Sequence, residues 1–288
     1  MRTIVVFLLS IATLVSCEKV VLDNVDDTAG GNLIVNTSTS EESSGINETK
    51  TATRALRPLS ELCTHITYAL YQDGTRVKYV NQKLDDDNFG SALISIPKGI
   101  YTLVVIGHSG ETNVSSLYIN KLTFGGKVTD TFEYCEEIEV TDEPKTIEAV
   151  LTRIVAMVRL KITGNIPANA AKLKFYYTGG SSSLDGETKL GCVVSRQTEY
   201  RDVSPSQTTY DIFTFPHEEK DVLQITVTAY DAVGNELIER LFSDIQVTTN
   251  YITCISGDFF DGSIDGFTNT ETILKADNEW AGQTDYTY

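Results

Sequence analysis

Alternating apolar and polar residues along most of the chain predict β-strands. Residues 64–71 and 75–80 alternate on either side of Asp73-Gly74, a dipeptide that favours a tight hairpin turn, and Gly234-Asn235 could form a second such turn. Similar short runs cover residues 92–96, 101–107, 116–119, 128–140, 172–177, 209–215, 223–230, 237–242 and 251–256. Because the runs are short and recur at intervals of roughly 8 to 15 residues, we expect an all-β chain built from antiparallel β-sandwiches.

Residues 147–162 fit two patterns. Apolar residues from Ile147 to Val158 fall at helical spacing, but every second residue from Ile154 to Ile162 is also apolar, with Arg159 and Lys161 between them. β-branched residues are frequent in this segment, so we favour a strand and keep a helix as the alternative.

The length of 288 residues suits two sandwiches in series. A polar joint at 141–145 contains one of the six prolines and marks the expected boundary between them. Residues 18–54 are rich in Ser, Thr, Asn, Asp, Glu and Gly, which predicts a flexible spacer, although Leu33-Ile34-Val35 could dock as an edge strand. The expected division is a signal peptide (1–16), a lipidated tether (17–55), an N-terminal sandwich (56–143), a C-terminal sandwich (144–260) and a polar tail (261–288).

The N-terminus has the features of an export signal. Arg2 precedes an apolar run, Ile4 to Val15, that is too short to span a membrane. The run ends in Leu14-Val15-Ser16-Cys17, which resembles the lipobox of bacterial lipoproteins and predicts lipid attachment at Cys17. An ordinary signal peptide with an incidental Cys is the alternative. Two or three acyl chains would tether the protein durably.

The net charge of -17 becomes -18 once Arg2 is removed with the signal. This acidity repels nucleic-acid phosphates, and no basic cluster offsets it, so we expect no nucleic-acid partner.

The cysteines Cys63, Cys135, Cys192 and Cys254 would be exported with the chain, where disulfides are chemically possible. We favour Cys63 with Cys135 and Cys192 with Cys254, because each pair then lies within one expected sandwich. Each bridge could contribute ~4 kcal/mol in the loop-entropy account. Four buried free thiols are the alternative, and the spacing gives no support to a zinc site.

The sequence offers no motif for catalysis or cofactor binding. The histidines His65, His108 and His217 lie far apart, and a Gly-x-Ser-x-Gly elbow is missing. Residues 85–88 and 261–266 lack the closing Glu of a calcium loop, and 179–183 lacks the Lys of a phosphate loop, so we interpret all three as turns. We therefore expect neither an enzyme nor a cofactor or metal.

Five stretches, in order, resemble the FimB-type family of fimbrillin-associated anchor lipoproteins of Bacteroidota. They are residues 66–74, 99–107, 153–162, 174–178 and 257–262. The resemblance implies two transthyretin-like sandwiches, lipid anchorage in the outer membrane, and fimbrial subunits as partners, joined by β-strand addition. It also places Arg54 and Arg57 where polymerising relatives are cut, and marks the tail after Phe260 as a candidate donor or docking element.

Two other function classes stay open. A surface glycan-binding lipoprotein would need an exposed aromatic platform, which the 14 tyrosines could supply. An exported hydrolase would need polar side chains that converge in a cleft.

Overall fold

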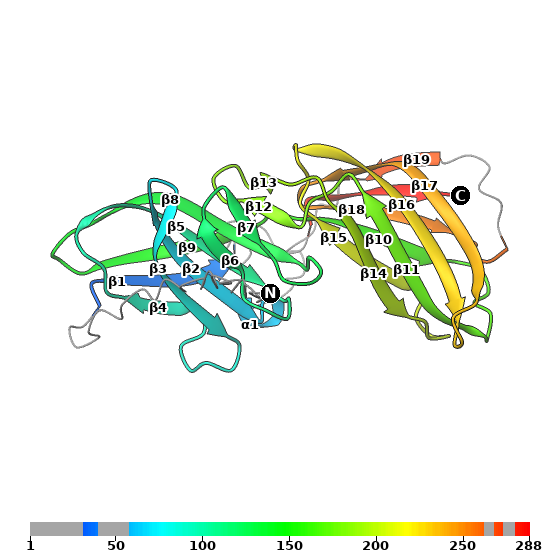
Figure 1. The fold of residues 1–288 in the computed structure, drawn as a ribbon, viewed down its shortest axis with the longest axis horizontal. Helices are drawn as coiled ribbons and strands as arrows, with labels where there is room; N and C mark the ends of the chain where they lie inside the picture. The colour runs from blue at the N-terminus through cyan, green and yellow to red at the C-terminus, as the bar shows by residue number, and fades with distance from the viewer. Residues whose placement is uncertain (1–30, 40–57, 262–267, 273–279) are drawn as a thin grey trace, which may run out of the picture. The chain divides into compact units, whose positions relative to one another are not determined.

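The computed structural model describes residues 31–39, 58–261, 268–272 and 280–288, and the regular structure there is almost entirely β (Figure 1). A short helix, α1, covers Leu59–Leu62. The strands, in chain order, are β1 (Leu33–Thr39), β2 (His65–Gln72), β3 (Thr75–Lys83), β4 (Ser91–Ile94), β5 (Gly99–His108), β6 (Ser115–Tyr118), β7 (Lys121–Thr123), β8 (Thr131–Val140), β9 (Lys145–Arg153), β10 (Ala156–Ile162), β11 (Ala170–Thr178), β12 (Ser183–Asp185), β13 (Leu190–Gly191), β14 (Arg196–Asp202), β15 (Thr209–Thr214), β16 (Lys220–Asp231), β17 (Glu236–Thr248), β18 (Tyr251–Gly257), β19 (Thr268–Thr272) and β20 (Gly282–Thr287). The expectation of an all-β fold is confirmed.

One extended sheet builds the first sandwich. Its strand order is β13-β12-β7-β6-β3-β2-β5-β8-β9-β1-β4. β8 and β9 pair at only two positions, Phe132↔Arg153 and Glu133↔Thr152, so the sheet can fold over at this junction. The buried core draws on both sides of it, since Tyr68 and Leu103 join Leu33 and Leu151 in one cluster.

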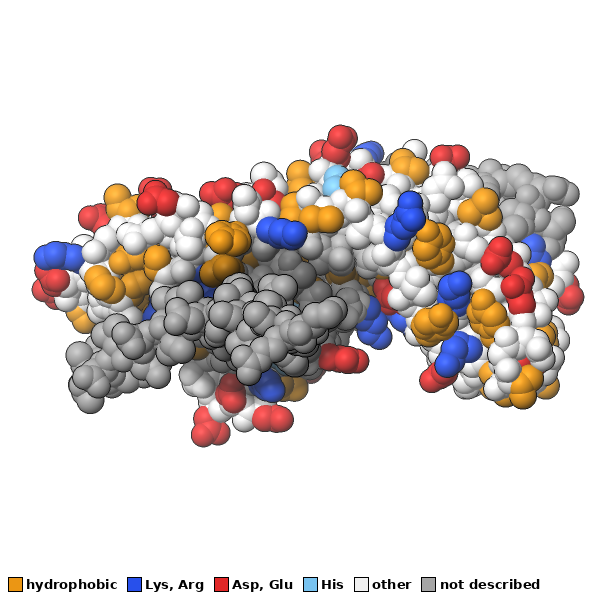
Figure 2. All heavy atoms as spheres, in the orientation of Figure 1, with side chains coloured by type: hydrophobic (Ala, Val, Ile, Leu, Met, Phe, Trp, Pro, Cys, Tyr) orange, Lys and Arg blue, Asp and Glu red, His pale blue; other side chains and the backbone are white. Residues whose placement is uncertain are grey.

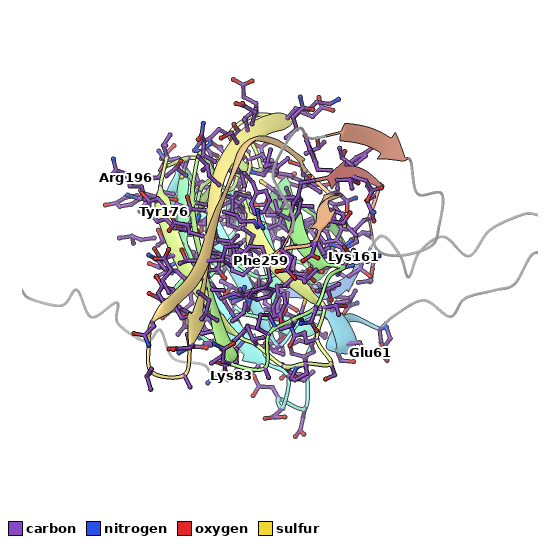
Figure 3. The ribbon with its side chains drawn as sticks, turned by 90° about the vertical axis from the view of Figure 1, so that its right-hand side faces the viewer. Glu61, Lys83, Lys161, Tyr176, Arg196 and Phe259 are labelled. Carbon is purple, nitrogen blue, oxygen red and sulfur yellow. The ribbon has the colours of Figure 1, made fainter. Side chains whose placement is uncertain are left out.

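Two separate sheets build the second sandwich, with the orders β15-β10-β18-β20-β19 and β14-β11-β16-β17. Leu160 and Ile255 from the first of these sheets share a buried cluster with Phe175 and Val227 from the second. Phe259 lies inside this core, whereas Tyr176 and Arg196 point outwards (Figure 3).

Turn chemistry sets both predicted hairpins. β2 and β3 are joined at Asp73 and Gly74, which have positive φ angles of 49° and 74°. β16 and β17 are joined through Gly234, with φ of 91°, and the Asp231 side chain accepts hydrogen bonds from the turn amides of Val233 and Asn235. A type of turn that needs φ above zero selects Gly, Asn or Asp, so both predictions are confirmed.

The ambiguous segment 147–162 is not a helix. It forms the end of β9 and all of β10, separated at Ile154 and Val155, so the preference for strand is confirmed. The boundary expected at residue 144 is wrong, however, because β9 pairs with β1 and β8 and its Leu151 lies in the first core. The passage from the first core to the second falls after Arg153.

Three strand pairs differ from the antiparallel expectation. β1 with β9, β10 with β18, and β18 with β20 are parallel. β1 lies inside the stretch expected to be tether, and it is not an edge strand, because β4 pairs with its other side. β20 lies inside the stretch expected to be a polar tail. Both terminal segments therefore contribute strands to the folded body.

Candidate functional site: terminal strands and sheet edges

The predicted lipid attachment residue, Cys17, lies outside the described residues, as do Arg54 and Arg57. No helix in the described part of the chain is both long enough and apolar enough to cross a bilayer. Attachment at Cys17 therefore stays a prediction from the sequence.

The favoured disulfides are not formed in this structure. Cys135, Cys192 and Cys254 carry free thiols, so neither expected pair is bonded. Cys63 belongs to the first core, whereas Cys135 packs against a different cluster on the opposite face of the sheet. Cys63 follows α1 and packs on one face of the sheet, whereas the Cys135 side chain leaves β8 on the other face, which keeps these two sulfur atoms apart.

β1 joins the end of the chain nearest Cys17 to the first sandwich. It pairs with β9 along all of Leu33–Thr39 and with β4 from Leu33 to Asn36. Leu33 and Val35 are fully buried, and Asn32 holds the strand entrance by donating to the carbonyl of Ile96 at 2.9 Å. Any force or tether that arrives from upstream residues therefore reaches the folded body through β1.

β20 is a strand of the second sandwich, as β1 is of the first. It lies between β18 and β19, and its parallel register with β18 runs from Tyr251↔Gly282 to Ser256↔Thr287. Tyr286 is buried in the second core, and its hydroxyl accepts a hydrogen bond from the Gln246 amide at 3.2 Å. If β20 left, the side of β18 that faces it would become an open edge.

The outer edge of β15 is closed by side chains. Arg201 donates to the Asp211 carbonyl at 2.7 Å, and the Tyr177 hydroxyl lies 3.3 Å from the Phe213 carbonyl. Further along, Ser181 and Phe215 form a backbone bridge in both directions. These bonds occupy groups that a free edge would offer to another chain.

The groups that close β15 also satisfy one another. Glu199 is almost fully buried, and it accepts from Arg201 at 2.6 Å and from the Tyr177 hydroxyl at 2.6 Å. Burial, followed by the Glu199 charge, raises the pKa of the Tyr177 phenol well above its usual value. The phenol therefore stays protonated and remains a donor.

Arg153 holds the junction after β9. Its guanidinium makes a two-point ion pair with Asp130, at 2.7 and 3.0 Å, and lies over the rings of Phe132 and Trp280 at 4.6 and 4.4 Å. Its Nη1 also lies 3.4 Å from the Asn250 side-chain oxygen. One of the stretches that carry the family resemblance begins at Arg153, but nothing in the sequence indicated that Asp130 and Trp280 would contact this residue.

Glu133 is a buried carboxyl whose two oxygens have no hydrogen-bond partner within the described parts of the chain. It lies on β8, and burial raises its pKa to about 8, an effect that Lys189 partly offsets and Asp185 reinforces. A carboxyl in such surroundings is protonated at neutral pH.

The histidines do not assemble into a catalytic group. His65 and His108 stack with ring centroids 5.4 Å apart, and burial lowers the pKa of His108 to about 4. His217 pairs with Asp221 at 2.9 Å. In the described ranges no three His, Cys, Asp or Glu side chains are placed to hold a metal ion.

A hollow of about 460 Å³ is lined by residues that include Lys127, Asp130, Arg201 and Asp211. Asp130 already pairs with Arg153, and Asp211 pairs with Arg159 at 2.7 Å. The acidic side chains of this hollow are thus engaged in structural ion pairs.

Three tyrosines of the described residues are about half exposed. Tyr79 and Tyr118 lie on the neighbouring strands β3 and β6, and Tyr200 lies on β14 in a different sheet. Trp280 is covered by Arg153 and Phe213. In Figure 2, hydrophobic, acidic and basic side chains are interspersed over the face in view.

Comparison with known proteins identifies one family. Residues 31–280 match the family described as fimbrillin-A associated anchor proteins Mfa1 and Mfa2. No curated protein matches the chain.

Several solved structures are similar to the chain at low sequence identity. A candidate adhesin from Bacteroides ovatus has a TM-score of 0.48 and 12% identity, over 75% of this chain and 84% of that one. The fimbrial anchor protein Mfa2 from Porphyromonas gingivalis has a TM-score of 0.39 and 14% identity, over 74% and 82%. A fimbrial assembly protein from Parabacteroides distasonis has a TM-score of 0.39 and 10% identity, over 79% and 90%.

Proposed function

Because the chain belongs to the family of fimbrillin-A associated anchor proteins, we propose that it is a lipid-anchored outer-membrane protein that serves as anchor or minor subunit of a fimbria. The observation that carries this proposal is the family match over residues 31–280, which begins a short distance after Cys17. The match supports a place at the cell surface with fimbrial subunits as partners. The proposed role is to bind fimbrial subunits and not to catalyse a reaction.

The position of β1 supports anchorage through Cys17. Sixteen residue steps separate Cys17 from Leu33, where β1 begins. A fully extended chain advances at most ~3.3–3.6 Å per residue, so the spacer would reach roughly 55 Å from the bilayer to the sandwich. The tether is therefore 17–32 in this proposal, shorter than the 17–55 expected from composition.

The lipid anchor is tested by replacing Cys17 with Ala in the producing cell. We expect the altered protein to appear in the culture fluid, and mass spectrometry of the native protein to find acyl chains on residue 17. Imaging should then show fimbriae that are detached or altered in length. An unacylated native protein, or unchanged fimbriae after deletion of the gene, would contradict the anchor.

We further propose that subunits join by β-strand addition, with β20 as the exchanging strand. Main-chain hydrogen bonds would provide the affinity, and pockets for alternate side chains would set the register. The support is topological: β20 lies between β18 and β19, and its departure would open the side of β18 that it covers.

A disulfide lock tests the exchange. Cys254 and Asp285 are register partners on β18 and β20, so Asp285→Cys places two sulfurs on adjacent strands within bridging distance. We expect the oxidised variant to be excluded from fimbriae and a reductant to restore it. Asp285→Ser is the matched control, because it removes the same carboxylate without forming a bridge. Normal incorporation of the oxidised variant would reject exchange of β20 and leave the anchor role untouched.

A further inference from the structure

Within the described residues, β3 has an open edge along most of its length. It pairs with β2 from Thr75 to Lys83, with a register shift between Leu70 and Tyr71 that leaves Val77 without a partner on β2, and on its outer side the only strand contact is with β6, at Thr75↔Tyr118. No other described strand lies against residues 77–83. This stretch contrasts with the closed edge of β15.

The hydrogen-bond alternation identifies which backbone groups face outwards. The Leu84 amide donates to the Thr64 carbonyl at 2.9 Å, so residues 84, 82, 80 and 78 direct their backbone groups towards β2. Residues 79, 81 and 83 face the other way. In agreement, the Lys83 amide donates to the Asp86 side chain at 2.8 Å and is capped. The outward groups of Tyr79 and Asn81 have no partner within the described ranges.

Side chains at this edge would suit contact with another chain. Val77 and Tyr79 are 42% and 44% exposed, and the Arg76 guanidinium lies 3.9 Å from the centre of the Tyr79 ring. The rigid, half-exposed ring offers apolar area at small entropic cost.

The charge along the edge changes sign. Residues 75–83 contain Arg76, Lys78 and Lys83 and no acid, in a chain whose net charge is -17, and Asp85, Asp86 and Asp87 follow directly (Lys83 is labelled in Figure 3). The edge carries basic residues from Arg76 to Lys83 and acidic residues just beyond it, so an antiparallel pair of copies brings Arg76 of each copy beside the acidic turn of the other. A parallel arrangement would bring like charges together.

We propose that this edge pairs with the same edge of a second copy of the chain. The two β3 strands run antiparallel about Val80, so that the outward groups of Tyr79 in one copy bond those of Asn81 in the other. The pairing is isologous, and each copy contributes the same residues.

The register of the two paired β3 strands follows from the features that limit the open edge at each end. β6 occupies the position beside Thr75, and the turn after Lys83 leaves the sheet, so residues 77–83 lie beside no other described strand, although the Lys83 amide is capped by Asp86. Only a centre at Val80 lets the two stretches overlap along their whole length. Arg76 of each copy then lies beside the acidic turn of the other.

Lysines on an edge strand commonly prevent association, because like charges meet when edges approach. Here the acidic residues 85–87 of one copy lie beside the basic residues of the other, so the charges favour the antiparallel arrangement and do not prevent association. The proposal is independent of the fimbrial role and concerns the isolated protein.

Sedimentation velocity of the purified protein over a range of concentrations tests the pairing. We expect a monomer–dimer equilibrium that weakens as salt is raised, since the charges are solvent-exposed. Arg76→Glu should weaken the dimer about tenfold, and Asp85→Arg by a similar factor. The double variant, Arg76→Glu with Asp85→Arg, restores opposite charges and should recover most of the lost affinity. Arg196→Glu, an exposed edge-strand arginine on β14, is the matched control and should leave the dimer unchanged.

A backbone variant provides a second test. Asn81→Pro removes an outward amide that does not bond β2, so circular dichroism should report a folded chain while the dimer is lost. If this variant does not fold, the charge series still decides the question. A protein that stays monomeric at every concentration overturns the proposal, and so does a dimer that neither single charge variant affects.

Discussion

The edges of β15 and β3 show two ways of treating exposed backbone. At β15, Arg201 and Tyr177 reach across from the facing sheet to the outward carbonyls, and Glu199 partners both of them. At β3, the Asp86 side chain caps the Lys83 amide, and the outward backbone groups of Tyr79 and Asn81 have no partner in the part of the chain that the structure describes. The two sandwiches also differ in their buried carboxyl groups, because Glu199 in the second accepts hydrogen bonds from Arg201 and Tyr177, whereas Glu133 on β8 in the first has no hydrogen-bond partner among the described residues. The second sandwich closes its edge with a buried polar network, and the first leaves one edge available for contact.

The largest effect should come from breaking the closed edge at Arg201. Arg201→Met leaves Glu199 buried without its cation, and we expect a loss of about 3–5 kcal/mol in the free energy of unfolding. Urea denaturation measures it. Arg196→Met, on the same strand but exposed, is the control and should change stability by less than about 0.5 kcal/mol. Equal effects for the two variants would show that the buried network adds nothing.

Glu133 should make stability depend on pH in the opposite sense from a paired acid. Burial raises its pKa from 4.5 to about 8, so the folded state binds more protons than the unfolded state in that interval. The free energy of unfolding should therefore fall by up to about 1.4 kcal/mol per pH unit from pH 4.5 to 8. Glu133→Gln should remove this slope.

The slope is obtained from urea titrations of both proteins at several pH values. Glu187→Gln, which replaces an exposed acid close in sequence to Lys189, serves as the control and should keep the wild-type slope. If Glu133→Gln retains that slope as well, the Glu133 carboxyl is ionised in the folded protein, and the prediction that it is protonated at neutral pH is contradicted.

Tyr177→Phe should weaken the closed edge without removing a charge. The hydroxyl that lies near Glu199, Gln197 and the Phe213 carbonyl is lost, and we expect a cost of about 1–2 kcal/mol. Thermal or urea unfolding measures the loss. Tyr176→Phe, the outward neighbour, is the control, and a smaller loss at Tyr177 than at Tyr176 would be inconsistent with a role in closing β15.

The smallest effect should come from the open edge. Asp86→Ala frees the Lys83 amide on the surface, where water can replace the bond, so stability should drop by only about 0.5 kcal/mol. The same variant lengthens the open edge by one residue. Asp87→Ala controls for loss of a turn charge, and a loss above about 2 kcal/mol at Asp86 would mean that this edge is also held for stability.

Local chemistry made part of this fold predictable. The two hairpins were predictable because the positive φ angles of Asp73, Gly74 and Gly234 favour Asp and Gly at these turn positions. The alternation after Ile154 likewise identified β10. Pairing between strands that are distant in sequence could not be predicted in this way. The residues of β9, Lys145–Arg153, do not themselves indicate that this strand pairs with β1 and does not begin the second sandwich.

The same limit applies to the candidate sites. Cys63 and Cys135 looked suited to a bridge because both fall within the expected N-terminal sandwich, but the face to which Cys135 points depends on the register of β8, which the sequence leaves open. The closure of the β15 edge by Arg201 could not be predicted either, because it depends on how the sheet that contains β14 packs against the sheet that contains β15. The predicted role of Cys17 came from its flanking residues alone.

The placement of β1 has a mechanical consequence. A pull transmitted from Cys17 would enter the strand at Leu33, and where it is directed along the strand axis the seven residue pairs shared with β9 are loaded together in shear. A terminal strand pulled sideways would instead unzip one bond at a time. A fibre held through β1 would thus resist tension through many bonds at once, with Leu33 and Val35 adding buried contacts that must slide before the strand can leave.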